Sequence, residues 1–326
     1  MKKIWNLPIV EFMPFQELQE TRSIVLVTSG PAWQAVSNRL NHLPIQAQVE
    51  PIEATTVHWD SLLTQLDDER TDPRPGVVYA VGGGLVADAA KYMAIKLELP
   101  LICLPTALSV DAFITSASGI RRDGCVYYIE TKVPETLIID LDVIASAPVH
   151  VRSAGICDVL SINTGLWDWK FAQERDQNPP EMAYIPWVAQ AAQSILQGAL
   201  DCAQAAGRGD HDGLKQLLDC LALEVQLCNQ IGHSRPEEGS EHYFAYLVEN
   251  YTGHGLPHGD LVGPGILIIS AKQGQSTESV RKALEACQIP LDNIPPAIVE
   301  RTLAQLAPYS IKHKLPYGIA HELPST

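Results

Sequence analysis

The first half of the chain alternates short apolar runs with stretches of helix-like patterning. The first run is rich in β-branched residues and leads into Ser29-Gly30-Pro31, which is typical of a helix start. The pattern predicts four strands, at residues 23–28, 77–81, 101–104 and 136–139. Because strands that alternate with helices form right-handed βαβ units, we expect a parallel sheet with helices on both faces. Asp123-Gly124 between the strand-like arms of residues 118–130 predicts a hairpin.

After about residue 147 the strand-like runs disappear and helical periodicity takes over. One apolar stripe repeats at intervals of three and four residues: Leu214, Leu217, Leu218, Leu221 and Val225. Similar stripes occupy residues 188–205, 280–287 and 298–306. We therefore expect an α/β domain over residues 1–147 with a Rossmann-like parallel sheet. An all-α domain over residues 148–326 would follow, with an active site in the cleft between the two.

Composition narrows the class of protein. A chain of 326 residues is longer than one hydrophobic core usually supports, which favours two domains. The net charge of −15 disfavours a nucleic-acid partner, so we expect a small-molecule substrate. No apolar run reaches the roughly 20 residues of a membrane span, and the first residues lack the apolar core of a secretion signal. Seven cysteines without a C-x-x-C pair favour reduced thiols, which predicts a cytoplasmic protein.

The run V-Y-A-V-G-G-G-L-V-A-D-A-A-K at residues 78–91 reads as a buried strand, three glycines and a helix. Backbone without side chains at Gly82, Gly83 and Gly84 lets a diphosphate approach the N-terminus of that helix. The alternative is a tight turn with no ligand, and the run departs from G-x-G-x-x-G. Asp88 and Lys91 share a helix face, so they form either a surface ion pair or, for Lys91, a cofactor contact.

Three residues of the second half form a candidate metal site. Asp158 lies in the apolar helical run G-I-C-D-V-L-S, where an uncompensated charge is costly to bury. His242 lies on a predicted helix with Tyr246 one turn later, and His258 lies in a Gly/Pro-rich loop. Two imidazoles and one carboxylate leave an open position, as in catalytic divalent sites. The alternatives are a partly exposed helix histidine, a loop histidine and an N-capping aspartate.

Several motifs, in order, resemble the iron-containing alcohol dehydrogenase and dehydroquinate-synthase-like superfamily. They are V-G-G-G-L-V-A-D-A-A-K, L-P-T-A-L-S-V-D-A-F, G-I-C-D-V-L-S, S-R-P-E-E-G-S-E-H and L-P-H-G-D. Within the superfamily, G-x-x-D-V-L-S-x-x-T-x-x-W-D-W-K and S-R-P-x-x-G-S-E-H are similar to the sn-glycerol-1-phosphate dehydrogenase branch. The resemblance covers residues 24–270, and its motifs are specific in combination.

The resemblance implies an oxidoreductase with NAD or NADP and one divalent metal, usually zinc and sometimes iron or nickel. The first domain would bind the dinucleotide, and the second would bind metal and substrate. The implied cofactor contacts are Gly82, Gly83, Gly84, Asp88, Thr106 and Ser109. The implied metal ligands are Asp158, His242 and His258, with Asp111 as a catalytic, substrate-contacting residue. We also expect a homo-oligomer.

Two positions depart from the superfamily. Tyr246 stands where a second histidine is common, and Asp260 follows His258-Gly259 where many members have glutamate. The candidates for passing a proton between substrate and solvent are Asp111, Tyr246 and His254, although His254 also fits an ordinary loop histidine.

The resemblance favours reduction of dihydroxyacetone phosphate by hydride transfer. Ser234 and Arg235 would hold the phosphate, with Arg152 or His233 as further donors and a plain surface arginine as the alternative for Arg235. A polyol or alcohol dehydrogenase is the second hypothesis. A carbocycle-forming lyase fits less well, because its first metal ligand is typically glutamate where this chain has Asp158. A cofactor-binding protein without activity is disfavoured by the intact ligand set.

Overall fold

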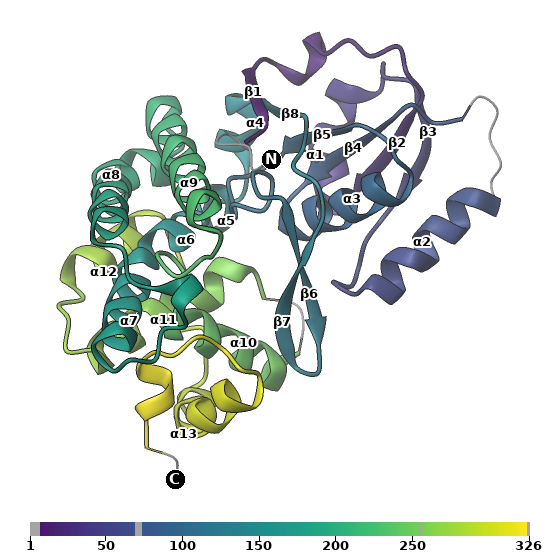
Figure 1. Ribbon diagram of the computed structural model, residues 1–326. Helices are drawn as coiled ribbons and strands as arrows, with labels where there is room; N and C mark the ends of the chain where they lie inside the picture. The colour runs from purple at the N-terminus through teal and green to yellow at the C-terminus, as the bar shows by residue number, and fades with distance from the viewer. Residues whose placement is uncertain (1–6, 69–73, 254–255, 325–326) are drawn as a thin grey trace. The chain divides into compact units, whose positions relative to one another are not determined.

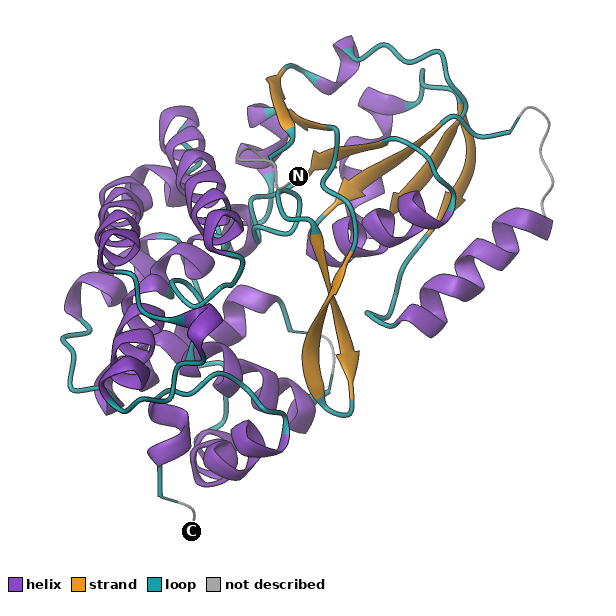
Figure 2. Ribbon diagram, viewed as in Figure 1, coloured by secondary structure: helices purple, strands orange, loops and turns teal. Residues whose placement is uncertain are grey.

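The computed structural model describes residues 7–68, 74–253 and 256–324, which form two compact units divided between Ala147 and Pro148 (Figure 1). All strands of the described residues lie in the first unit (Figure 2). They are β1 (Ile9–Phe12), β2 (Ile24–Thr28), β3 (Ile45–Val49), β4 (Val77–Gly82), β5 (Leu101–Pro105), β6 (Ala117–Arg122), β7 (Cys125–Glu130) and β8 (Thr136–Ile139). The helices of this unit are η1 (Phe15–Glu17), α1 (Gly30–Leu40), α2 (Thr56–Asp68), α3 (Gly84–Lys96) and α4 (Leu141–Ser146).

Six strands form one parallel sheet in the order β1-β8-β5-β4-β2-β3. The four predicted strands are confirmed, as β2, β4, β5 and β8. The pattern missed β1, whose four residues are all exposed, and β3, whose glutamines interrupt any apolar run. The predicted hairpin is β6 and β7, and its turn places Asp123 (φ 54°) and Gly124 (φ 75°) in the left-handed region that such a turn requires.

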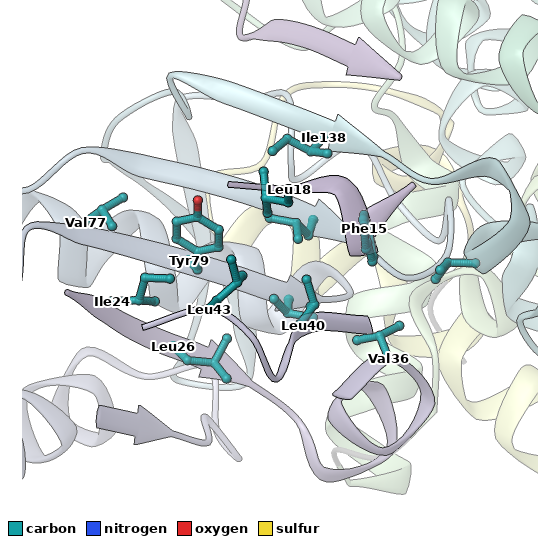
Figure 3. Packing of buried hydrophobic residues seen from close by; sticks show 13 residues of the cluster. Phe15, Leu18, Ile24, Leu26, Val36, Leu40, Leu43, Val77, Tyr79 and Ile138 are labelled. Carbon is teal, nitrogen blue, oxygen red and sulfur yellow. The ribbon is translucent and has the colours of Figure 1, made fainter. Parts of the chain in front are cut away.

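Alternate residues of the sheet face opposite sides. Val77, Tyr79 and Val81 of β4 pack in one cluster with Val36 and Leu40 of α1 (Figure 3). The intervening residues of β4 are also fully buried, as expected for a parallel sheet covered on both faces. The connection from β2 leads to β3, toward one edge of the sheet, whereas the connection from β4 leads to β5, toward the other edge. Right-handed crossovers therefore place α1 and α3 on opposite faces, and the strand order reverses between β2 and β4.

The second unit is helical throughout its described residues. Its helices are α5 (Val149–Arg152), α6 (Ile156–Leu160), α7 (Ile162–Glu174), η2 (Pro180–Met182), α8 (Pro186–Arg208), α9 (His211–Ile231), α10 (Ser240–Thr252), α11 (His258–Lys272), α12 (Glu278–Ala286), α13 (Pro296–Lys312) and η3 (Ile319–Glu322). The predicted stripe of α9 is buried, and α8 and α9 each end at a left-handed glycine, Gly209 and Gly232. Across the described part of the chain, no helix combines the length and apolarity needed to cross a membrane.

Candidate metal centre and dinucleotide site

Three side chains from three helices converge in the second unit. Asp158 of α6, His242 of α10 and His258 of α11 each offer a ligand atom, and these atoms lie within 4.8 Å of one another. The Asp158 Oδ1 to His258 Nε2 distance is 3.0 Å, and the two imidazole centroids are 5.3 Å apart. Asp158 and His242 are only 6% and 5% exposed, so neither is an ordinary surface side chain. The structure thus brings together all three predicted ligands.

This donor set fits a divalent transition metal. Ligand bonds of about 2.0 to 2.2 Å hold the atoms of a tetrahedral site roughly 3.3 Å apart, which is compatible with the observed separations. Two neutral imidazoles and one carboxylate suit zinc, iron or nickel rather than calcium or magnesium, which prefer oxygen ligands. Three protein ligands leave a position for water or substrate.

Glu241 orients His242. Its Oε1 lies 2.8 Å from Nδ1 of His242 and also accepts a 2.7 Å hydrogen bond from the Gly239 N–H. With Nδ1 engaged, Nε2 is the nitrogen available for a metal. Burial alone disfavours the imidazolium, but the hydrogen bond and charge of Glu241 outweigh it and raise the pKa of His242 to about 9.

A proton and a metal ion therefore compete for His242. Below pH 9 the metal must displace a proton, so we expect apparent metal affinity to fall about tenfold from about pH 8 to about pH 7. Chelator competition at several pH values measures this slope. Glu241→Gln removes the carboxylate that raises the pKa, so it should flatten the slope. An affinity that does not change with pH in the unsubstituted protein would contradict the prediction.

A buried aspartate fixes the start of α10. Asp168 of α7 is fully buried, and its Oδ2 accepts hydrogen bonds from the backbone N–H and the hydroxyl of Ser240, at 2.8 and 2.5 Å. Its Oδ1 accepts from Gln273 Nε2 at 3.1 Å and from the Ile319 N–H at 2.8 Å. Burial raises the pKa of Asp168, while the bonds from Ser240 and Ile319 oppose that shift. Asp168 thus ties α7, α11 and η3 to the helix that carries His242.

His258 was predicted in a loop, and this was wrong. It is the first residue of α11, which follows Pro257 in an extended conformation. Gly259 lets α11 approach the segment that leads into α6, because a Cβ there would lie 3.1 Å from the Ala154 Cβ. Pro264 inside α11 leaves the Asp260 carbonyl without its helical partner, and Asn293 Nδ2 donates to that oxygen at 3.0 Å. A proline and glycine-rich segment therefore forms a helix.

Tyr246 lies beside His242, one of the three ligands. Its ring centroid is 6.1 Å from that of His242, and its hydroxyl donates a 2.6 Å hydrogen bond to Glu238 Oε1. The other oxygen of Glu238 accepts from the Ser234 hydroxyl at 2.7 Å. Glu238 and Ser234 are both partly exposed, so this chain of polar groups runs from the buried Tyr246 toward the surface of the unit.

Arg235 is not the surface residue that one alternative predicts, because only 2% of it is exposed. Its Nη2 donates to the Tyr317 carbonyl at 2.7 Å, while Nε and Nη1 make no hydrogen bond within the described residues. Arg152, the other candidate cation, lies in α5, and its Nη1 donates to the Gly207 carbonyl at 3.4 Å. Two guanidinium nitrogens of Arg235 are thus buried donors without a hydrogen-bond partner among the described residues.

The glycine run forms the turn between β4 and α3. A Cβ on Gly82 would lie 2.9 Å from Val86 Cγ2, and one on Gly84 would lie 2.7 Å from Val110 Cγ1, so the protein's own packing already requires these two glycines. Gly83 has more room, with Ser109 Oγ at 3.3 Å. Since the first N–H groups of a helix lack intrahelical partners, the turn offers donors to a diphosphate.

The P-T-x-x-S segment lies against this turn. The Thr106 N–H donates to the Gly82 carbonyl at 3.2 Å, and Ser109 faces Gly83. Asp111 follows in the same loop, half-buried, and its carbonyl accepts from the Ile114 N–H. The structure therefore groups Thr106 and Ser109 with the glycines, as the predicted cofactor set requires. His254 lies outside the described residues.

Asp88 and Lys91 do not form the surface pair that one alternative predicts. Lys91 is fully buried, and its Nζ lies 3.0 Å from Asp88 Oδ1. Lys91 also donates to the carbonyls of Ala112 and Ala117, and Asp88 Oδ2 accepts from the Gly119 N–H at 3.2 Å. The pair anchors residues 112–119 to α3, and a cofactor contact of Asp88 stays a prediction.

Sequence patterns did not identify Glu241, Asp168 or Glu238 as residues of the site. Neighbouring residues of a helix do not normally face each other, so Glu241 beside His242 carried no signal on spacing alone. It reaches Nδ1 because it lies in the first turn, where the Gly239 N–H is also available. Asp168 is 72 residues from Ser240, and only its place in W-D-W-K, an aspartate between tryptophans, hinted at a buried carboxylate.

Comparison with known proteins shows related sequences and folds. Residues 13–148 match the family model described as iron-containing alcohol dehydrogenase. The glycerol-1-phosphate dehydrogenase (NAD(P)+) of Saccharolobus islandicus is 26% identical over 278 residues, which cover 85% of this chain and 78% of the relative. The protein of the same name from Metallosphaera sedula is 29% identical over 271 residues, covering 82% and 75%. The motif-based resemblance is thereby confirmed.

Solved structures share the fold at lower identity. The glycerol dehydrogenase of Schizosaccharomyces pombe has a TM-score of 0.66 and 21% identity, covering 99% of this chain and 86% of that chain. The sulfoacetaldehyde reductase of Bifidobacterium kashiwanohense, solved with NAD+, has a TM-score of 0.67 and 14% identity, covering 100% and 99%. These likenesses confirm the predicted fold class, a parallel α/β sheet followed by a helical region.

Proposed function

We propose that this chain, a relative of the iron-containing alcohol dehydrogenases, is a metal-dependent, NAD(P)-linked oxidoreductase that reduces dihydroxyacetone phosphate to glycerol 1-phosphate. The observation that carries the proposal is the convergence of Asp158, His242 and His258 within 4.8 Å. The names of the curated relatives support the substrate. The reaction consumes one reduced dinucleotide and one proton for each ketone reduced.

Each group of residues has a part in this chemistry. When bound, a divalent ion polarises the ketone oxygen and the reduced nicotinamide supplies the hydride. Asp158, His242 and His258 would hold the ion, and Glu241 keeps Nε2 of His242 directed to it. Gly82, Gly83 and Gly84 would hold the diphosphate, with Thr106 and Ser109 beside the nicotinamide.

Reduction of the ketone adds a proton to its oxygen, and we assign Tyr246 a part in delivering that proton. Its hydroxyl is hydrogen-bonded to Glu238, which in turn accepts from Ser234. Both of these partners are partly exposed, so a proton taken from solvent has a hydrogen-bonded route to the buried phenol. Asp111 is the other candidate among the described residues.

The substrate phosphate would be held by Arg235. Two of its buried guanidinium nitrogens have no hydrogen-bond partner within the described residues. Leaving buried charged donors unpaired is costly, and a phosphate oxygen would satisfy them. On a chain with a net charge of −15, a local cation of this kind is what an anionic substrate requires.

Arg235→Ala is therefore expected to raise KM for dihydroxyacetone phosphate about ten- to a hundredfold and to leave unphosphorylated dihydroxyacetone nearly unaffected. Arg235→Lys is the matched variant, since it keeps the charge but loses the planar guanidinium. Its KM for dihydroxyacetone phosphate should lie between those of the unsubstituted protein and Arg235→Ala. Steady-state kinetics with both ketones measures the effect. Equal losses on the two substrates would assign Arg235 a structural role, through its bond to Tyr317.

The proposed reaction is tested by following NADH and NADPH absorbance in the presence of dihydroxyacetone phosphate, dihydroxyacetone and simple aldehydes. We expect sustained consumption that is fastest with dihydroxyacetone phosphate. A preference for unphosphorylated ketones would indicate a polyol dehydrogenase. No net consumption with any ketone would contradict the dehydrogenase and leave the lyase or a non-catalytic relative.

A further inference from the structure

A carboxylate lies at the turn between β2 and α1, next to the glycine run. Glu50 directly follows β3, and its Oε1 accepts a 2.7 Å hydrogen bond from the backbone N–H of Gly30, the first residue of α1. The side chain is exposed, and Oε2 makes no hydrogen bond within the described residues. Glu50 therefore offers one carboxylate oxygen as an acceptor at this turn.

The register of the sheet places this carboxylate close to the glycine strand. Thr28 pairs with Val81, and its hydroxyl donates to the Val81 carbonyl at 2.7 Å, so the residues that follow β2 lie level with Gly82. On the other side of β2, Val27 pairs with Val49, which puts Glu50 across from Thr28. Because Glu50 reaches back to Gly30, its carboxylate lies beyond the carboxyl end of β2, the strand that pairs with β4.

This is the point where the strand order reverses, between β2 and β4. In open parallel sheets, ligands bind beyond the carboxyl ends of the strands at such a point. With the diphosphate at the N-terminus of α3, the adenosine half of a dinucleotide extends over the end of the adjacent strand. An acidic residue there accepts a hydrogen bond from the ribose 2′-hydroxyl of NAD, whereas the 2′-phosphate of NADP meets a like charge.

We propose that Glu50 is the residue by which this chain selects NAD(H) over NADP(H), an inference that rests on the dinucleotide binding in the proposed function. The two residues that follow β2, Ser29 and Gly30, carry no charge, so this strand itself supplies no acidic residue. Glu50, from the next strand, supplies the carboxylate instead. Its contact with Gly30 holds it in place before any ligand arrives.

A competing role for Glu50 is to cap α1. Ser29, the N-cap residue, makes no side-chain hydrogen bond to that helix, and a carboxylate at a helix N-terminus is favourable by itself. Glu50→Gln separates the two roles. The amide oxygen can still accept from the Gly30 N–H, but the negative charge that repels a 2′-phosphate is gone.

The test measures dissociation constants for NADH and NADPH by fluorescence titration of the full-length, metal-loaded protein. We expect the unsubstituted protein to bind NADH about ten- to a hundredfold more tightly than NADPH, the range for one charge-assisted contact. Glu50→Gln should reduce that ratio about tenfold, mainly through tighter NADPH binding. Glu53→Gln is the matched control, since Glu53 is exposed three residues later and makes no hydrogen bond within the described residues.

Equal affinities for NADH and NADPH in the unsubstituted protein would overturn the role of Glu50, as would an unchanged ratio in Glu50→Gln. A Glu50→Gln protein that is less stable but equally selective would assign the residue to capping alone. In all three cases the proposed reaction would stand, because binding of either dinucleotide suffices for it. Failure of both dinucleotides to bind would instead contradict the proposed function, and this inference with it.

Discussion

Asp158→Asn is expected to release the divalent ion and to abolish ketone reduction, while the protein stays folded. Asp158 is the only anionic member of the three ligands, and the amide that replaces it binds a metal cation far more weakly. Loss of a residue that merely orients a ligand costs about 10- to 100-fold in metal affinity, so loss of the ligand itself should cost more. Metal content, thermal unfolding without metal and activity together measure the effect.

Two further variants sharpen this prediction. His258→Ala should behave like Asp158→Asn, and because the His258 side chain is 27% exposed, its removal leaves little cavity. Asp212→Asn is the matched control, since Asp212 is an exposed aspartate in the first turn of α9, also in the second unit. Asp158→Asn protein that retains one metal ion per chain, or full activity after chelation, would show that the three residues are not the site.

Asp168→Ala is expected to lower the free energy of unfolding by about 3 to 5 kcal/mol, the range for breaking a buried charged network. Its carboxylate accepts four hydrogen bonds, from the N–H and hydroxyl of Ser240, from Gln273 and from Ile319. The Ser240 and Ile319 donors would lose this acceptor, whereas Gln273 Nε2 would keep the Thr164 carbonyl, at 3.1 Å. Asp168→Asn should also destabilise, because its amide N–H2 would face donors. Since Ser240 begins α10, metal affinity should fall as well.

Urea unfolding of the metal-free protein measures this loss. Asp219→Ala is the control, because Asp219 is 56% exposed and its ion pair with Lys215, 2.7 Å long, is a surface pair worth at most about 1 kcal/mol. A change below about 0.5 kcal/mol in Asp168→Ala would contradict the role of Asp168 as an anchor of α10.

The sequence predicted elements with strong periodicity and missed those that depend on tertiary context. β2, β4, β5 and β8 have apolar runs because both faces of the sheet are covered. β1 is an edge strand with four exposed residues, and no pattern distinguishes it from a loop. The segment that becomes α11 contains glycines and a proline, and two tertiary contacts support it as a helix: close packing of Gly259 on Ala154 and a hydrogen bond from Asn293 to the freed Asp260 carbonyl.

The metal ligands illustrate the same limit. Asp158, His242 and His258 are chemically suitable, but their separation in sequence left the metal site and the ordinary alternatives open until the resemblance favoured the site. Their convergence depends on the packing of α6, α10 and α11, which no local pattern encodes. Asp168 could not be recognised for this reason, since its contact with Ser240 spans 72 residues and exists only after α7 and α10 have packed together.

The central claim is that the site formed by Asp158, His242 and His258 holds a metal required for dinucleotide-dependent ketone reduction. The most direct measurement strips the purified protein with a chelator, restores one equivalent of zinc, iron or nickel, and follows NADH consumption with dihydroxyacetone phosphate at each stage. We expect activity to disappear on stripping, to return with about one metal ion per chain, and not to return in Asp158→Asn. Undiminished reduction by the stripped protein, or equal recovery in Asp158→Asn, would contradict the claim.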